Sequence, residues 1–203
     1  MVDTVQLLLI RHAQPEYARV NLGRADPSLT EQGLVQAGRL REALAPYRIS
    51  RLFSSPQLRA LQTAQPLADQ QELPVEQIKG LAEYDYDLDH YIPFETAQEL
   101  GSDAYKRILA GHLPDFVDAE LFRTRVLTSV DQVVSSCPHE DTAVIFAHGG
   151  VINIVLQDLL GLELPLAFPI EYASITRILV SRTGRRRVAS INETGHVRDT
   201  LRV

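Results

Sequence analysis

Two runs of apolar residues along the chain are almost unbroken by polar positions. One covers residues 6–10 (QLLLI) and the other covers residues 142–147 (TAVIFA). Short apolar runs that do not alternate with polar residues are typical of strands covered on both faces, as in a parallel sheet. We therefore predict that these two runs are central strands of one sheet.

Helical patterns lie between and after these strands. Apolar residues recur at helical spacing over residues 34–44, after Thr30, which is a favoured N-cap residue. Ser55 followed by Pro56 predicts a second helix, with Ser55 as its cap and proline in the first helical position. Pro66 is expected to kink or end that helix.

The remaining pattern completes an alternation of strands and helices. We predict further strands at residues 51–53 and 75–78, helices at 97–109 and 116–134, and a hairpin of strands 174–180 and 187–191 around Thr183-Gly184. This alternation predicts an α/β three-layer sandwich with a mostly parallel central sheet flanked by helices. A chain of 203 residues is expected to form a single domain over residues 1–203.

Charge and composition indicate which kinds of partner the protein does not bind. The chain has 26 acidic and 20 basic residues, a net charge of −6 and no apolar stretch that would span a bilayer. We therefore expect neither nucleic acid nor membrane as a partner, while a homodimer stays open. Cys137 is the only cysteine, which excludes an intrachain disulfide and fits a reducing compartment. We expect a cytoplasmic protein.

The residues directly after the two central strands are the first candidates for chemistry. They are Arg11-His12 and His148-Gly149-Gly150. In open α/β sheets, ligands bind beyond the carboxyl ends of the strands, so both histidines could reach one crevice. Arginine presents a fork of donors suited to phosphate oxygens, and the glycines allow an anion to approach backbone amides at a helix start. The pattern predicts an anion site that contains a base.

Four motifs in this order resemble the histidine phosphatase superfamily, which is also called phosphoglycerate-mutase-like. They are the Arg-His pair after the first strand (residues 8–12), DPSLTEQG (26–33), SSPQLRALQTA (54–64) and AHGGVI (147–152). The resemblance implies that the protein shares the fold of that superfamily and transfers phosphoryl groups.

The resemblance also assigns roles to individual residues. It implies that His12 attacks phosphorus and becomes phosphohistidine, that Arg11 and Arg59 bind the transferred group, and that His148 completes the cradle beside Gly149. We expect the arginine charges to lower the pKa of His12, and a backbone carbonyl to fix its tautomer. No cofactor is expected. No metal is expected either, because His90, His112 and His139 lack the paired spacing of zinc ligands.

The leaving oxygen needs a proton, and the family places a carboxylic acid after the third strand. Glu83 is the first candidate for this acid, with Asp85 and Asp87 as alternatives in the same carboxylate-rich run. An acid in that position is expected to have a raised pKa. The segment 83–118 is expected to form a lid over the site, with Tyr84, Tyr86, Tyr91 and Phe94 as candidate walls.

The sequence departs from the family pattern close to the nucleophile. Ala13 stands where glycine is usual, and Pro15 stands where a serine or threonine often contacts phosphate. Proline removes an amide donor and alanine restricts the backbone, so the phosphate cradle is expected to be altered. Gln14 and Asn21 are the polar residues that could bind substrate in their place.

The leading hypothesis is a metal-independent phosphatase of the histidine acid type, a phosphomonoester hydrolase that acts on a small phosphorylated metabolite through phosphohistidine. A cofactor-dependent phosphoglycerate mutase is one alternative, although the chain lacks the longer insertion expected of such mutases. A weakly active phosphate-binding regulatory module is the other, because of Ala13, Pro15 and the altered lid.

Overall fold

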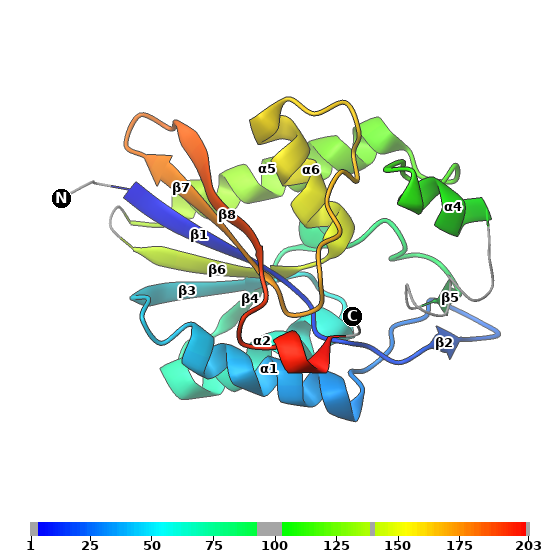
Figure 1. Ribbon diagram of the computed structural model, residues 1–203, viewed down its shortest axis with the longest axis horizontal. Helices are drawn as coiled ribbons and strands as arrows, with labels where there is room; N and C mark the ends of the chain where they lie inside the picture. Colours follow the sequence, from blue (N-terminus) through cyan, green and yellow to red (C-terminus); the bar gives the residue numbers. More distant parts are fainter. Residues whose placement is uncertain (1–3, 93–102, 139–140, 202–203) are drawn as a thin grey trace.

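The computed structural model describes residues 4–92, 103–138 and 141–201, and a six-stranded sheet runs through its centre (Figure 1). The strands lie in the order β4–β3–β6–β1–β7–β8. They are β1 (Thr4–Arg11), β3 (Ile49–Ser54), β4 (Val75–Gln77), β6 (Thr142–Ala147), β7 (Ile175–Ser181) and β8 (Arg186–Glu193). The first four are parallel, β7 is antiparallel to β1, and β8 is antiparallel to β7. The predicted mostly parallel sheet is confirmed.

Helices cover both faces of the sheet. In Figure 1, α1 (Glu31–Ala43) and α2 (Leu58–Gln71) lie on one side, and α5 (Ala119–Ser136) and α6 (Gly149–Leu160) lie on the other. A short helix, α4 (Asp103–Leu109), stands away from the sheet. This arrangement is the predicted three-layer sandwich.

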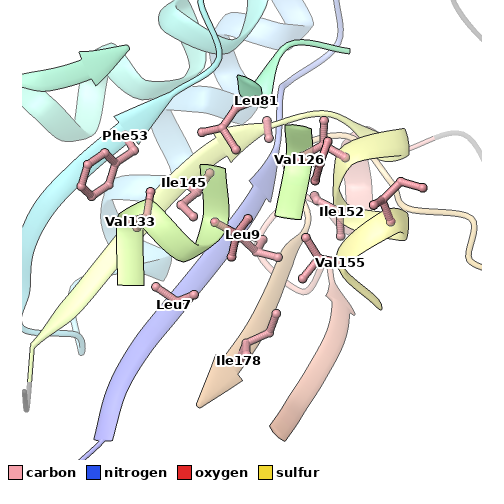
Figure 2. Close-up of a cluster of buried hydrophobic side chains, with 14 of the residues drawn as sticks. Leu7, Leu9, Phe53, Leu81, Val126, Val133, Ile145, Ile152, Val155 and Ile178 are labelled. Atoms are coloured by element: carbon pink, nitrogen blue, oxygen red, sulfur yellow. The ribbon is translucent and has the colours of Figure 1, made fainter. Parts of the chain in front are cut away.

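The unbroken apolar runs are explained by two separate hydrophobic cores. Leu7 and Leu9 of β1 pack in the core under α5 and α6, as Figure 2 shows, whereas Leu8 and Ile10 pack in the core under α1 and α2. All four side chains are at most 1% exposed. Because successive side chains of a strand point to opposite faces, a strand buried on both faces needs an apolar residue at every position.

The predicted start of α2 is wrong, and so is one of the two effects expected of Pro66. The helix begins at Leu58 with Gln57 as its N-cap residue, and not at Pro56 after a Ser55 cap. The N–H of Leu58 is satisfied instead by Asp26 Oδ1 at 2.8 Å, which is distant in sequence. Pro66 does not end the helix, which continues to Gln71. The buried residues around Pro66 pack in the core and outweigh the loss of one hydrogen bond.

The other predicted elements are found with small shifts. Helix α1 is capped by Thr30, whose Oγ1 accepts a hydrogen bond from the Gly33 N–H at 2.9 Å. β7 and β8 form the predicted hairpin, and Gly184 takes a positive φ of 79° at its turn. Residues 97–102 of the helix predicted at 97–109, together with Phe94 and His139, lie outside the described residues. Within the described ranges, no helix is long and apolar enough to cross a membrane.

A small second sheet stands beside the carboxyl ends of the central strands. It pairs β2 (Ala18–Arg19) with β5 (His90–Tyr91) in antiparallel register. Short 3₁₀ turns, η1 (Lys79–Leu81) and η2 (Arg198–Thr200), complete the described elements. β5 brings Tyr91 toward the ends of β1, β3 and β6, because the guanidinium carbon of Arg59 lies 4.3 Å from the centre of the Tyr91 ring.

Candidate active site

Three adjacent parallel strands deliver polar side chains to the same edge of the sheet. His12 follows β1, Ser55 follows β3 and His148 follows β6. The rings of His12 and His148 are 5.1 Å apart between centroids, and His148 Nε2 lies 2.8 Å from Ser55 Oγ. The two histidines expected to share one crevice are therefore in contact.

The hydrogen bonds of His12 fix its tautomer. Its Nδ1 lies 2.8 Å from the carbonyl oxygen of Ala13, which can only accept, so Nδ1 carries the proton and Nε2 keeps its lone pair. Burial lowers the pKa of His12 well below its ordinary value, and the charges of Arg59 and Arg11 lower it further. The predicted direction and tautomer are confirmed, although burial outweighs the arginine charges. His12 is thus neutral, with a lone pair on Nε2.

Arg59 is a buried cation, and some of its N–H donors have no partner among the described residues. Its side chain is 1% exposed, and its Nη2 lies 2.9 and 3.0 Å from the two carboxylate oxygens of Asp85. Its Nε and Nη1 have no hydrogen-bond partner among the described residues. Buried polar groups are rarely left in that state without a ligand, so these N–H groups are available to an oxyanion.

Arg11 is held in one orientation by two residues far along the chain. It donates to the carbonyl oxygen of Ile170, and its guanidinium carbon lies 4.0 Å from the centre of the Tyr172 ring. Gly149 faces it, since a Cβ at that position would lie 3.8 Å from Arg11 Nε. His148 is neutral as well, because burial and then Arg59 lower its pKa well below the ordinary value.

Glu83 lies at the N-terminus of α6, against Gly150. Its Oε2 accepts from the Gly150 N–H at 2.8 Å, and its Oε1 accepts from the Tyr84 N–H at 3.1 Å. Burial, and secondly the charge of Asp85, raise the pKa of Glu83 to about 7 in spite of these bonds. A carboxyl group with that pKa can both give and take a proton near neutrality.

The two alternative acids have different surroundings. Asp85 is engaged with Arg59 and with Gln57 Nε2, which lies 2.9 Å from its Oδ1. Asp87 is exposed to solvent. Of the three carboxylates, Glu83 is therefore the one that is buried and that, among the described residues, has no cationic side chain bound to it.

The residues after His12 are held by α1, its N-cap Thr30 and α2. The N–H of Gln14 donates to Gln36 Oε1 at 2.9 Å, and the carbonyl of Gln14 accepts from the Thr30 N–H at 3.0 Å. The N–H of Ala13 donates to Thr63 Oγ1 at 2.9 Å. Because the backbone N–H groups of Ala13 and Gln14 already donate to side chains of the protein, they do not form the cradle for an anion.

The remaining candidates differ in their connection to the site. Pro15 is buried and bridges to Leu29, whereas the Gln14 side chain has its Oε1 3.5 Å from Thr30 Oγ1. Asn21 is exposed, and no hydrogen bond joins it to another described residue. The structure thus brings Arg11, His12, Arg59, Glu83, His148 and Gly149 together, but it does not connect Asn21 to them.

Sequence reasoning missed several residues that complete the site. Ser55 contacts His148, Gln57 contacts the segment of Glu83, and Tyr172 stacks on Arg11. Ser55 could have been found, since it follows a predicted strand as both histidines do. Tyr172 gave no such signal, because it lies in a loop far along the chain. Among residues 4–92, 103–138 and 141–201, no group of three or more His, Cys, Asp or Glu could hold a metal ion.

Comparison with known proteins finds a family model and several relatives that match most of the chain. The model of the histidine phosphatase superfamily (branch 1) matches residues 7–194. A protein of Hydrogenobacter thermophilus, provisionally named phosphoserine phosphatase 2, is 32% identical over 85% of this chain and 88% of its own length. Phosphoserine phosphatase 1 of the same organism is 26% identical over 95% of this chain and 94% of its own length.

Solved structures show the same likeness. The phosphoserine phosphatase of Entamoeba histolytica, crystallised as a histidine-to-alanine mutant with phosphoserine, has a TM-score of 0.69 and 27% identity, with coverage of 95% of this chain and 99% of that one. A mycobacterial glucosyl-3-phosphoglycerate phosphatase in complex with VO₃ has a TM-score of 0.74 and 25% identity, with coverage of 92% and 98%.

Proposed function

The chain belongs to the histidine phosphatase superfamily (branch 1) and is a phosphatase, and we propose that it hydrolyses a small phosphomonoester through a phosphohistidine formed at His12. The observation that carries this proposal is the bond from His12 Nδ1 to the Ala13 carbonyl. It leaves the Nε2 lone pair as a nucleophile close to the charges of Arg59 and Arg11.

The first step transfers the phosphoryl group to the enzyme. Nε2 of His12 attacks phosphorus in line with the bond to the leaving oxygen, and a N–P bond forms as the P–O bond breaks. Arg11 and Arg59 offset the charge on the equatorial oxygens, which is the main task of a protein in phosphoryl transfer. Glu83, protonated at its raised pKa, gives its proton to the leaving oxygen.

The second step returns the enzyme to its starting state. A water molecule attacks phosphorus, the N–P bond breaks, and the Glu83 carboxylate takes the proton of the water. Inorganic phosphate leaves, with His12 neutral and Glu83 protonated again. No step in this sequence uses a cofactor. The relatives reported above are named phosphatases, and no observation favours the mutase alternative.

We propose phosphoserine as the first substrate to test. Two curated relatives carry this substrate in their names, and the Entamoeba enzyme was crystallised with it. Phosphoserine and glucosyl-3-phosphoglycerate both join phosphate to a short alcohol that bears a carboxylate. A small phosphate ester of this type is the substrate class that we infer.

We further propose that the segment 83–118 acts as a lid. Its start is tied to the site by Glu83, and Tyr91 stacks on Arg59. Tyr84 packs against Phe116 and Phe122, with ring centroids 6.5 and 5.9 Å apart. Aromatic side chains from this segment thus reach both the phosphate pocket and α5, as a cover over bound substrate requires.

The cytoplasm is the location that we propose. Cys137 is the only cysteine of the chain and is buried as a free thiol, a state that a reducing compartment preserves. Subcellular fractionation with an antibody against the native protein tests this location. Recovery in a membrane or secreted fraction would contradict it.

The test of the proposed function is release of inorganic phosphate from a panel of phosphomonoesters, with a chelator present throughout. Phosphoserine, 3-phosphoglycerate, a sugar phosphate and a nucleotide would be compared for the wild type and for His12→Ala. We expect turnover of the carboxylate-bearing esters that resists the chelator and is lost in His12→Ala. No release by the wild type from any ester, or full activity of His12→Ala, would overturn the proposal.

A further inference from the structure

Gln57 is a buried glutamine at the start of α2, and its side chain does not cap that helix. It is the N-cap residue, with an extended backbone (φ −73°, ψ 136°), but its side chain makes no cap hydrogen bond. The side chain is nevertheless 2% exposed, so its amide must find partners elsewhere in the protein. The hydrogen-bond partners of this amide therefore indicate the role of Gln57.

Both ends of this amide bind the acidic loop, which we define as residues 83–89. Oε1 accepts from the backbone N–H of Glu83 at 2.7 Å, and Nε2 donates to Asp85 Oδ1 at 2.9 Å. The orientation of the amide is certain, because a backbone N–H can only donate and a carboxylate can only accept. Gln57 therefore holds the loop at two points, one on each side of Tyr84.

The same side chain is linked to the residues proposed to bind phosphate. Ser55 Oγ lies 3.4 Å from Gln57 Oε1 and 2.8 Å from His148 Nε2. Two residues further along the chain, Arg59 shares Asp85 Oδ1 with the Gln57 amide. Gln57 thus lies between the groups that face phosphate and the loop that carries Glu83.

We propose that Gln57 is a positioning residue that sets Glu83 against the leaving oxygen of the substrate. This inference rests on the proposed function, in which Glu83 protonates that oxygen. The carboxylate of Glu83 is anchored separately on Gly150. From α5, Arg125 donates to the Glu83 carbonyl and to the carbonyls of Gly80 and Ala82, which precede the loop. Gln57 is the side chain that binds both the backbone N–H of the acid and the aspartate beside it.

This arrangement separates two parts of the catalysis. In the proposed mechanism His12 attacks phosphorus, and its ring is fixed by the Ala13 carbonyl and not by Gln57. Arg59 meets Gln57 only through Asp85, which Arg59 binds with two contacts of its own from Nη2. Loss of the amide should therefore misplace Glu83 and leave the attack itself intact. A serine leaving group needs a proton from Glu83, whereas p-nitrophenolate is a stable anion that leaves without one.

The experiment compares single-turnover rates, with enzyme in excess, for phosphoserine and p-nitrophenyl phosphate. Gln57→Leu keeps the approximate shape of the side chain and removes both hydrogen bonds. We expect the phosphoserine rate to fall about a hundredfold and the p-nitrophenyl phosphate rate to change less than about threefold. The matched control is Gln65→Leu on the same helix, because Gln65 is exposed and also binds an aspartate, Asp69. Both of its rates should equal those of the wild type.

Gln57→Glu gives a second test, which decides the question if Gln57→Leu does not fold. A protonated carboxyl group has a donor and an acceptor like the amide, but an ionised one loses the donor and repels Asp85. Relative to the wild type at each pH, the phosphoserine rate should fall as pH rises, while the p-nitrophenyl phosphate rate should not.

The possible results are distinct. An equal fall for both substrates in the variants would assign Gln57 a merely structural role and overturn the inference, as would unchanged rates for both. A wild type that turns over neither substrate would instead overturn the proposed function, and the inference with it.

Discussion

Arg59 and Asp85 form an ion pair through a single guanidinium nitrogen, Nη2, which lies 2.9 Å from Oδ1 and 3.0 Å from Oδ2. Their side chains are 1% and 14% exposed. Asp85 partly offsets the charge of Arg59 before substrate binds, while Nε and Nη1 remain without a partner among the described residues. After burial, the same carboxylate is the second cause of the raised pKa of Glu83, so one residue acts on both Arg59 and the proposed acid.

Asp85→Asn is therefore expected to have two effects. The pKa of Glu83 should fall because a nearby negative charge is lost, so the alkaline limb of kcat/KM for phosphoserine should move to lower pH by about one unit. Inorganic phosphate should inhibit more strongly, because Arg59 keeps its full charge for the anion. A pH profile and a phosphate inhibition constant measure these effects. An alkaline limb at its wild-type position would contradict the electrostatic role of Asp85.

Glu83→Gln tests the acid itself. Glu83 must be protonated to donate, so wild-type kcat/KM for phosphoserine should decline as pH rises through about 7. In the variant, this limb should vanish and single-turnover cleavage of phosphoserine should slow about a hundredfold or more. The initial burst of p-nitrophenol from p-nitrophenyl phosphate should persist. A variant that cleaves phosphoserine at the wild-type rate would exclude Glu83 as the acid.

The protonation state of His12 can be observed directly. Because burial and two arginines lower its pKa well below the ordinary value, its ring should stay neutral in the ligand-free enzyme at pH values at which free histidine is already protonated. ¹⁵N-labelled imidazole resonances should show Nδ1 protonated and Nε2 bare, as the Ala13 carbonyl requires. Assignment of the resonance with His12→Ala is the control. The opposite tautomer, or a titration above the value of free histidine, would disprove this state.

Gly33→Ala tests how α1 supports the loop after the nucleophile. A Cβ at Gly33 would lie 2.1 Å from the carbonyl oxygen of Gln14, a backbone atom that cannot move aside freely. We expect the free energy of unfolding to fall by about 1–3 kcal/mol, measured by urea denaturation. Gly38→Ala on the same helix is the matched control, because nothing lies within 4 Å of its Cβ. It should raise stability by up to about 1 kcal/mol, and equal effects of the two changes would refute the steric account.

The sequence predicted the sheet and the pair of histidines because both depend on local pattern. A strand buried on both faces must be apolar throughout, and polar residues that follow such strands reach one edge by geometry. The residues 6–10 and 142–147 therefore identified β1 and β6, and with them His12 and His148.

The partners of these residues could not be predicted in the same way. Gln57, Thr63 and Tyr172 join the site through contacts with residues that are distant in sequence. Gln57 binds Glu83, Thr63 binds Ala13 and Tyr172 stacks on Arg11. No periodic pattern in the sequence encodes such contacts. The start of α2 was misplaced for the same reason, since Asp26 satisfies its first N–H from another part of the chain. The sequence also did not reveal how deeply His12 is buried, although burial is the largest cause of its low pKa.

The central claim is that the phosphoryl group passes through His12. Its most direct test is to mix the enzyme with ³²P-labelled phosphoserine, quench the reaction in alkali within milliseconds, and map the label by peptide mass spectrometry. The account predicts an acid-labile, alkali-stable phosphoryl group on the peptide that contains His12, and none in His12→Ala. A label on another residue, or turnover of phosphoserine by His12→Ala, would contradict it.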